Sequence, residues 1–169
     1  MMVKEKSIFQ RTISKPVTLK GVGLHTGAEV SVKILPAKTY TGFVFKRVDI
    51  YGSPLVEADI KWISDTQRGT NLEKNGIKIQ TCEHVLSALV GLQIDNCIIE
   101  LDSSEPPIMD GSSKFFVEAL LNADYEQQSE LIKEYIVTEN INYKSCSNEI
   151  SSFISISSSI DWFLRLSSS

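Results

Sequence analysis

Short runs of alternating apolar and polar residues characterise the first eighty positions of the chain. Residues 30–35 read Val, Ser, Val, Lys, Ile, Leu, and residues 43–45 read Phe, Val, Phe. A period of two residues is typical of half-buried β-strands, and β-branched and aromatic residues favour that conformation. Glycines separate the runs as turn residues do, at positions 21, 23, 27, 42, 52 and 76. This part of the sequence therefore predicts a series of β-strands.

The period of the pattern changes at Thr81. Apolar side chains then recur at helical spacing, at positions 82, 85, 86, 89 and 90. This spacing predicts a helix that has Thr81 as its N-cap and ends at Gly91. The apolar run 96–101 that follows predicts a buried strand.

A second helix is predicted after the proline-containing loop 102–111. Ser112 or Ser113 is a candidate N-cap, and the apolar residues at positions 116, 117, 120 and 121 would face a core. We expect a helix end or a linker over the acidic, glutamine-rich segment 124–134, and one further strand over 135–143. The order of strands, helix, strand and helix predicts an α+β domain in which a β-sheet packs on a pair of helices.

Serine is concentrated at the C-terminal end of the chain. Residues 145–169 contain eleven serines, as many as the preceding 144 residues together. This composition is typical of a low-complexity tail, or it indicates that the natural sequence is interrupted near residue 149 or 150, by truncation or by a change of reading frame. We favour the interruption, because nothing after the predicted strand could complete a second core. We therefore expect a first domain over 1–125, a linker and the first strand of an incomplete second domain over 126–144, and a serine-rich tail that is not a folded domain over 145–169.

The overall composition is that of a soluble globular protein. Of the 169 residues 42% are hydrophobic and 22% are charged, and the net charge is −4. Proteins that bind nucleic acid or anionic membranes generally have a positive net charge, so neither class is favoured. The longest apolar stretch, Val85–Leu92, is too short to span a membrane, and the N-terminus lacks the apolar region of a signal peptide. The three cysteines include no Cys-x-x-Cys pair, which is consistent with reduced thiols in a cytoplasm.

Glu83 and His84 are the strongest candidates for chemistry. They lie in the predicted first turn of a helix, where neighbouring side chains project about 100° apart, so they cannot chelate one atom but can flank one site. His84 would bind a metal and Glu83 would reach the water bound to it. The positive end of the helix dipole disfavours an imidazolium and leaves a ring nitrogen free to bind. The plainer interpretation is a surface Glu-His pair at a helix start.

Three other features have both a chemical and a structural interpretation. The glycine-rich segment Gly21–Gly27, which contains His25, is either a phosphate-binding loop or a hairpin turn, and the strand expected after it favours the turn. Cys82 is either a nucleophile or a small core residue, and its place on the apolar face favours the core. Turn formation and helix capping explain best the loop carboxylates Asp102, Glu105 and Asp110.

Four segments together resemble the family of UDP-3-O-acyl-N-acetylglucosamine deacetylase, a zinc amidohydrolase of lipid A and hence lipopolysaccharide biosynthesis. In chain order they are Gln10–Ile13, Gly21–Gly27, Glu83-His84 with Ala88–Asn96, and Pro107–Ser112. Their order and spacing are specific, and the resemblance covers residues 8 to 145. The stretch Arg68–Thr70 is similar to members of the family that are fused to a 3-hydroxyacyl dehydratase.

The resemblance implies a fold of two similar domains with the active site between them, of which this chain holds the first. It implies that His84 is a ligand of Zn²⁺, that Glu83 is the general base, and that His25 lies near the site. It assigns no substrate-binding residue. The implied reaction releases acetate from UDP-3-O-acyl-N-acetylglucosamine in the cytoplasm.

The sequence also departs from the family pattern. The family's other zinc ligands belong to a His-Lys-x-x-Asp motif of the second domain, and no histidine follows His84 in this chain. We therefore expect an incomplete fragment that is inactive alone. The alternative is a non-catalytic binding or structural module that pairs with a separate second-domain chain, and an exposed inter-domain face would then favour self-association. A metal-free acid–base enzyme that uses His25 and Glu83 is a third reading, which only the resemblance supports.

Overall fold

The structure is a computed structural model that describes residues 9–66, 69–132, 141–144 and 149–152. The chain divides into two compact units, residues 1–132 and residues 133–169. The first unit contains β1 (Phe9–Ile13), β2 (Val17–Val22), β3 (Glu29–Pro36), β4 (Phe43–Arg47), β5 (Leu55–Glu57), the 3₁₀ turn η1 (Ile60–Trp62), β6 (Ile63–Asp65), β7 (Asn71–Lys74), β8 (Ile77–Ile79), α1 (Glu83–Gly91), β9 (Cys97–Leu101), α2 (Lys114–Ala123) and β10 (Tyr125–Leu131). This order confirms the predicted α+β class.

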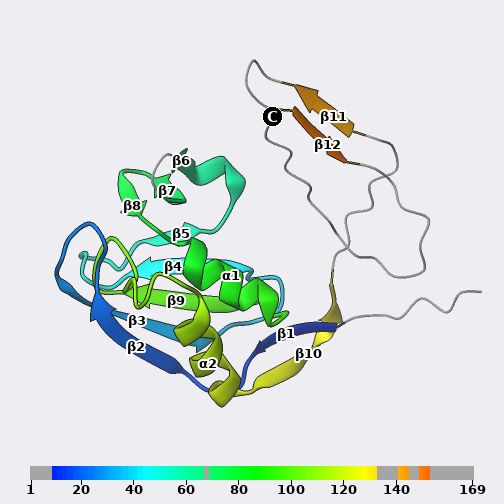
Figure 1. The fold of residues 1–169 in the computed structure, drawn as a ribbon. Helices are drawn as coiled ribbons and strands as arrows, with labels where there is room; N and C mark the ends of the chain where they lie inside the picture. Colours follow the sequence, from blue (N-terminus) through cyan, green and yellow to red (C-terminus); the bar gives the residue numbers. More distant parts are fainter. Residues whose placement is uncertain (1–8, 67–68, 133–140, 145–148, 153–169) are drawn as a thin grey trace, which may run out of the picture. The chain divides into compact units, whose positions relative to one another are not determined.

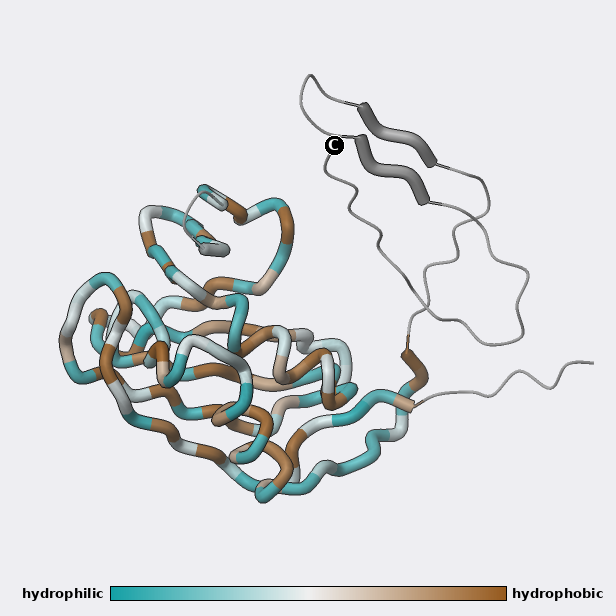
Figure 2. The backbone as a smooth tube through the Cα atoms, viewed as in Figure 1, coloured by the Kyte–Doolittle hydropathy of each residue, from teal (hydrophilic) through white to brown (hydrophobic). Residues whose placement is uncertain are grey.

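A five-stranded sheet and two helices form the body of the first unit (Figure 1). The strand order is β2-β3-β9-β4-β5, and β4 runs parallel to β9 while the other neighbours are antiparallel. Both helices lie side by side over one face of the sheet. Figure 2 shows that hydrophobic residues recur along the central strands and on the helices. The alternation of side chains along each strand directs these residues toward the helices and produces a core.

Helix periodicity decides which apolar residues enter this core. Helix α1 buries Val85, Ala88 and Leu89, and α2 buries Phe116, Leu120 and Ala123. Leu121, which we expected to face the core, and Val90, which is part of the apolar spacing of α1, are each 63% exposed. Each follows a buried residue directly and so projects about 100° away from it. The two helices therefore present apolar side chains on their outer sides as well.

Helix α1 ends at Gly91, as predicted, but the glycine is not the residue that reverses the chain. The left-handed residue is Gln93, whose φ is 56°. The N–H of Ile94 donates to the carbonyl of Leu89 at 3.0 Å, and the N–H of Gln93 donates to that of Val90 at 2.9 Å. These two bonds form a Schellman motif with a glutamine in the place that glycine usually takes.

Residues 125–131 correct one expectation, because this segment is neither a helix end nor a linker. It forms β10, which pairs antiparallel with β1 so that Phe9 lies opposite Leu131 and Ile13 opposite Tyr125. Most of its side chains are polar and exposed, so it lacks the apolar alternation that marks a half-buried strand. Backbone pairing with β1 rather than burial therefore holds it.

A buried amide network ties this ribbon to the sheet. Asn96 is 1% exposed, and its amide nitrogen donates to the side-chain oxygens of Gln10 and Gln128, both at 2.8 Å. Its amide oxygen accepts the N–H of Gly42 at 2.9 Å. Gln10 in turn accepts the N–H of Tyr40 and donates to a carbonyl of β10. Both polar atoms of the Asn96 amide group are thus bonded: the nitrogen joins β1 and β10 to the residue before β9, and the oxygen holds the residue before β4.

A three-stranded sheet, β6-β7-β8, attaches to the edge of the larger sheet near β5. Arg47 at the end of β4 connects the two sheets, since its Nη1 donates to the carbonyl of Lys78 at 2.8 Å. The Asp49 carboxylate takes two further guanidinium N–H groups at 2.8 and 2.7 Å. This bidentate pair orients the guanidinium, and the bond to Lys78 attaches the small sheet, whose strand β7 contacts Thr81 before the candidate site below.

In the second unit, β11 (Ile141–Lys144) pairs antiparallel with β12 (Glu149–Ser152). The strand predicted over 135–143 is therefore confirmed for 141–143, while residues 135–140 lie outside the described residues. Residues 145–148 and 153–169 of the serine-rich segment also lie outside them. The domain boundaries and the interruption of the sequence remain predictions. In the described part of the chain, neither helix is long and apolar enough to span a membrane.

Candidate active site

Glu83 is the first residue of α1, and its carboxylate is anchored on one side. Oε2 accepts the backbone N–H of Thr70 at 2.9 Å. A Cβ atom at Gly69 would lie 3.1 Å from Oε1, so the glycine leaves room for the carboxylate. Among the described residues, none donates a hydrogen bond to Oε1. A carboxylate with one anchored and one unbonded oxygen has the geometry to accept a proton.

His84 follows in the same turn and is half-buried. Its backbone carbonyl accepts the hydroxyl of Ser87 at 3.1 Å, which is a local helical contact. The two side chains thus lie where the sequence predicted, at the start of α1. That they flank one chemical site remains a prediction.

Thr81, two positions before this helix, is strained, and it is not the N-cap that we predicted. Thr81 has a φ of 52°, a region that β-branched residues rarely adopt. Its N–H donates to the side chain of Asn71 at 3.1 Å, whereas its buried hydroxyl has no partner among the described residues. Cys82 occupies the N-cap position with helical torsion angles and makes no side-chain capping bond. Tertiary contacts therefore replace the capping bond at this helix start.

Cys82 is a core residue, as its position on the apolar face predicted. It is fully buried, and its N–H and Sγ both lie against the carbonyl of Thr70, at 3.2 and 3.1 Å. Burial, reinforced by the charge of Glu83, raises the pKa of the Cys82 thiol to about 12. A thiol in this state is a poor nucleophile at neutral pH.

The glycine-rich segment Gly21–Gly27 forms a hairpin turn between β2 and β3, as favoured above. The N–H groups of His25 and Thr26 donate to Oε1 of Glu105, at 3.0 and 2.8 Å. A bound phosphate would need such donors, and here a carboxylate of the protein itself already takes them. The phosphate-binding interpretation is therefore wrong for these two groups, and the His25 residue is exposed.

Glu105 is a residue whose role the sequence did not indicate. The expected turn role applies to Asp110, whose Oδ1 accepts both the hydroxyl and the N–H of Ser112, and these bonds lower the pKa of Asp110. Asp102 instead accepts the N–H of Ser31 on β3 at 2.7 Å, which is a contact with a distant strand and not the turn or cap that we expected. Glu105, by contrast, is 0% exposed. No pattern in the sequence distinguishes it from the carboxylates on either side.

The connection between β9 and α2 contacts both the His25 loop and the segment that precedes α1. The carbonyl of Ser104 accepts the N–H of Gln80 at 2.7 Å, and its hydroxyl donates to the Gln80 side chain at 3.2 Å. Gln80 lies three positions before Glu83, and the residue after Ser104 holds the backbone of His25. The structure therefore attaches the His25 loop and Gln80, which lies three positions before α1 begins, to the same dipeptide.

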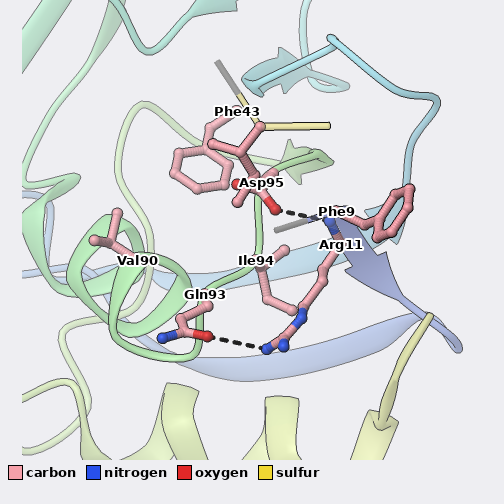
Figure 3. Close-up of a pocket in the computed structure, with 8 residues that line it drawn as sticks. Phe9, Arg11, Phe43, Val90, Gln93, Ile94 and Asp95 are labelled. Atoms are coloured by element: carbon pink, nitrogen blue, oxygen red, sulfur yellow. Dashed lines mark hydrogen bonds between the residues drawn. The ribbon is translucent and has the colours of Figure 1, made fainter. Parts of the chain in front are cut away.

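Two of the motif segments have a structural role instead. The N–H of Arg11 donates to Oδ2 of Asp95 at 2.7 Å, and the N–H of Asp95 donates to the Arg11 carbonyl at 2.8 Å (Figure 3). They line a hollow of about 420 Å³ together with apolar residues such as Phe43 and Val90. Burial raises the pKa of Asp95 above its ordinary value. None of the three candidate site residues lines this hollow.

The described residues do not form a complete zinc site. Among them, no group of three or more His, Cys, Asp or Glu side chains could hold a metal ion. A catalytic zinc usually has three protein ligands. His84 is one candidate ligand, so further ligands would have to come from elsewhere.

Comparison with known proteins shows what this chain is similar to. The family model described as UDP-3-O-acyl N-acetylglycosamine deacetylase (LpxC) matches residues 10–163. A bifunctional enzyme LpxC/FabZ of Chlorobaculum tepidum is 46% identical over 136 residues, which are 80% of this chain and 29% of the relative. The UDP-3-O-acyl-N-acetylglucosamine deacetylase of Psychrobacter sp. is 47% identical over 120 residues, 71% of this chain and 40% of the relative.

A third relative, the deacetylase of Thermodesulfovibrio yellowstonii, is 38% identical over 142 residues, 84% of this chain and 48% of the relative. The chain thus spans less than half the length of these curated relatives. Because the family model covers most of the sequence, this chain belongs to the UDP-3-O-acyl-N-acetylglucosamine deacetylase family.

Proposed function

We propose that this chain provides the Glu83-His84 part of a zinc-dependent deacetylase that releases acetate from UDP-3-O-acyl-N-acetylglucosamine in lipid A biosynthesis. Membership of the family supports the reaction class. The observation that carries the proposal for this chain is the geometry of Glu83, with one carboxylate oxygen held by Thr70. The free, buried thiols of Cys82 and Cys97 support a reducing compartment such as the cytoplasm.

The roles follow from the position of each residue. Glu83 takes a proton from the water that attacks the acetamide carbonyl, since its second oxygen is unbonded among the described residues. His84 supplies one ligand to Zn²⁺, and His25 lies beside the site on a fixed loop. Because the described residues do not complete the metal site, we propose that the chain alone does not turn over substrate.

Complementation tests this proposal. The chain would be mixed with the separately produced remainder of the Psychrobacter sp. relative, and acetate release would be measured with and without a chelator. We expect no release by the chain alone and zinc-dependent release by the mixture. Glu83→Gln and His84→Ala should each abolish that release, while Glu100→Gln, on the outer face of β9, should preserve it. Release that persists in both site variants would contradict the assigned roles.

A non-catalytic module is the second candidate, because α1 and α2 expose apolar side chains. Val90 and Leu121 are each 63% exposed, and clustered exposed apolar residues mark association surfaces. A stable complex with the second-domain chain that releases no acetate would favour this function. Self-association through the same surface should appear as concentration-dependent oligomers that Leu121→Ser weakens, and a monodisperse monomer at high concentration would count against it.

A further inference from the structure

The Glu105 carboxylate is a buried anion held by the backbone of another loop. Its side chain is 0% exposed and lies in the connection between β9 and α2. Oε1 accepts the N–H of His25 at 3.0 Å and that of Thr26 at 2.8 Å, and Oε2 lies 3.2 Å from the same His25 nitrogen. Buried carboxylates are uncommon unless they are satisfied in this way. Two consecutive N–H groups therefore form a small anion-binding nest for this side chain.

Gly23 makes this approach possible. A Cβ atom at position 23 would lie 2.4 Å from Oε1 of Glu105 and equally close to the hydroxyl of Thr26. Real Cβ atoms are essentially never found at such distances, so any side chain at position 23 would displace the carboxylate or the loop. Gly23 does not have a positive φ. This glycine is consequently required for space and not for its backbone conformation.

Glu105 is the attachment at the tip of the loop. At the base, the N–H of Ile108 donates to the carbonyl of Val22 at 2.9 Å. Within the loop, the N–H of Gly27 donates to the carbonyl of Gly23 at 3.1 Å, which closes the turn but connects it to nothing else. In the described part of the chain, Glu105 alone ties the backbone of His25 and Thr26 to a different element.

We propose that Glu105 is a positioning residue that fixes the His25 loop relative to the start of α1. The preceding residue, Ser104, makes two hydrogen bonds to Gln80, close to Glu83 in the chain. One dipeptide thus sets the distance between the loop of His25 and the helix start that carries Glu83. The anchorage itself is independent of the proposed function. Only its consequence, that this placement serves deacetylation, rests on that function.

Glu105→Gln in the full chain tests the anchorage. Glutamine keeps the shape of the side chain and one oxygen acceptor, but it removes the negative charge, and the atom in the place of Oε2, 3.2 Å from the His25 nitrogen, becomes an NH₂ group that cannot accept. We expect amide hydrogen exchange at His25 and Thr26 to accelerate about tenfold or more, since hydrogen bonds to charged groups are the stronger ones. Glu100→Gln is the matched control, because Glu100 lies on β9 and pairs with Lys46 instead.

A spectroscopic readout separates positioning from a merely structural role. The sequence has two histidines, so the imidazole proton resonances of His25 and His84 can be followed individually. In Glu105→Gln the His25 imidazole resonances should shift while those of His84 stay in place. Unchanged exchange at His25 and Thr26, or unchanged His25 imidazole resonances, in a folded Glu105→Gln chain would overturn the proposal.

A second pair of variants keeps the proposal testable if Glu105→Gln does not fold. Gly23→Ala should produce the same changes at His25, because its Cβ displaces the carboxylate. Gly91→Ala is the control, since that glycine has no positive φ and open space around its Cβ position. A folded Gly23→Ala chain with wild-type exchange at His25 would also overturn the proposal.

The proposed function and this inference can fail independently. The exchange and resonance measurements need neither zinc nor substrate, so they report the anchorage even if the complemented protein releases no acetate. If the anchorage is confirmed and the complemented protein is active, Glu105→Gln should lower kcat more than it raises KM. Equal kcat values for wild type and Glu105→Gln would refute the role of the anchorage in deacetylation. They would not contradict the proposed zinc-dependent reaction.

Discussion

Replacing Asn96 with alanine measures how much the buried amide network stabilises the first unit. The substitution removes three hydrogen bonds, two of 2.8 Å and one of 2.9 Å. Gln10 keeps the N–H of Tyr40 as a donor to its side-chain oxygen, so it is not orphaned. The N–H of Gly42 and the side-chain oxygen of Gln128 each lose a described partner.

The expected cost follows from these two orphaned groups. Leaving a buried polar group without a partner costs about 1–3 kcal/mol, so two partly buried groups and the small cavity should together lower the free energy of unfolding by about 2–4 kcal/mol. Domains of this size are typically stable by about 5–15 kcal/mol, so the variant should fold with a clearly lower urea midpoint.

Urea unfolding followed by circular dichroism is a suitable assay. Asn122→Ala is the matched control, because Asn122 is exposed on α2, and its effect should stay within about 0.5 kcal/mol. If Asn96→Ala costs less than about 1 kcal/mol with an unchanged m-value, the network is not a major source of stability, and the attachment of β10 must be explained by backbone pairing alone.

Three further predictions concern single groups. Hydrogen bonds from Arg47 lower the pKa of Asp49 in the folded state. The ionised carboxylate therefore stabilises the fold above its unfolded pKa of about 3.9, and this stabilisation is lost as the pH falls through the folded pKa. In acid titrations of unfolding, the stability difference between wild type and Asp49→Asn should accordingly shrink below about pH 4. Thr81→Val removes a buried hydroxyl that has no described partner, and it should raise the free energy of unfolding by about 1 kcal/mol; a loss of stability would show that the hydroxyl is bonded. Burial raises the thiol pKa values of Cys82 and Cys97 to about 12. Both should therefore react with a thiol reagent only as fast as the protein unfolds, and rapid labelling of either one in the native protein would contradict their burial.

Apolar periodicity predicted the elements that bury side chains. The helix at Glu83–Gly91, the strand at Cys97–Leu101 and the helix at Lys114–Ala123 all have apolar residues at the spacing of their secondary structure. Val90 and Leu121 show the limit of that argument, because a wide apolar stripe does not reveal which edge of it meets the sheet. Only the packing of the helices decides that point.

The features that the sequence did not predict depend on partners distant in the chain. Strand β10 has no apolar alternation, and its partner β1 precedes it by more than a hundred residues. Thr81 is a residue type that favours the N-cap position, yet contacts with the small sheet determine its conformation. In the sequence, Glu105 cannot be distinguished from the neighbouring loop carboxylates. Only the structure shows that Gly23 approaches its carboxylate closely. The proposed roles of Glu83 and His84 rest on the family resemblance, whereas their position at a helix start was predicted from the apolar spacing.

The pairing of β1 with β10 has a consequence for the synthesis of this chain. β1 is the first strand of the unit to be made and its partner is the last, since the bond from Gln10 to the carbonyl of Leu131 spans 121 positions. At the usual rate of translation, roughly 5–20 residues per second, β1 waits roughly 6–24 s for its partner. During that interval its edge is open to other strands, which is the situation in which chaperones protect nascent chains. A mutation that weakens β10 would therefore lower the yield of folded protein more than it lowers the stability of the molecules that do fold.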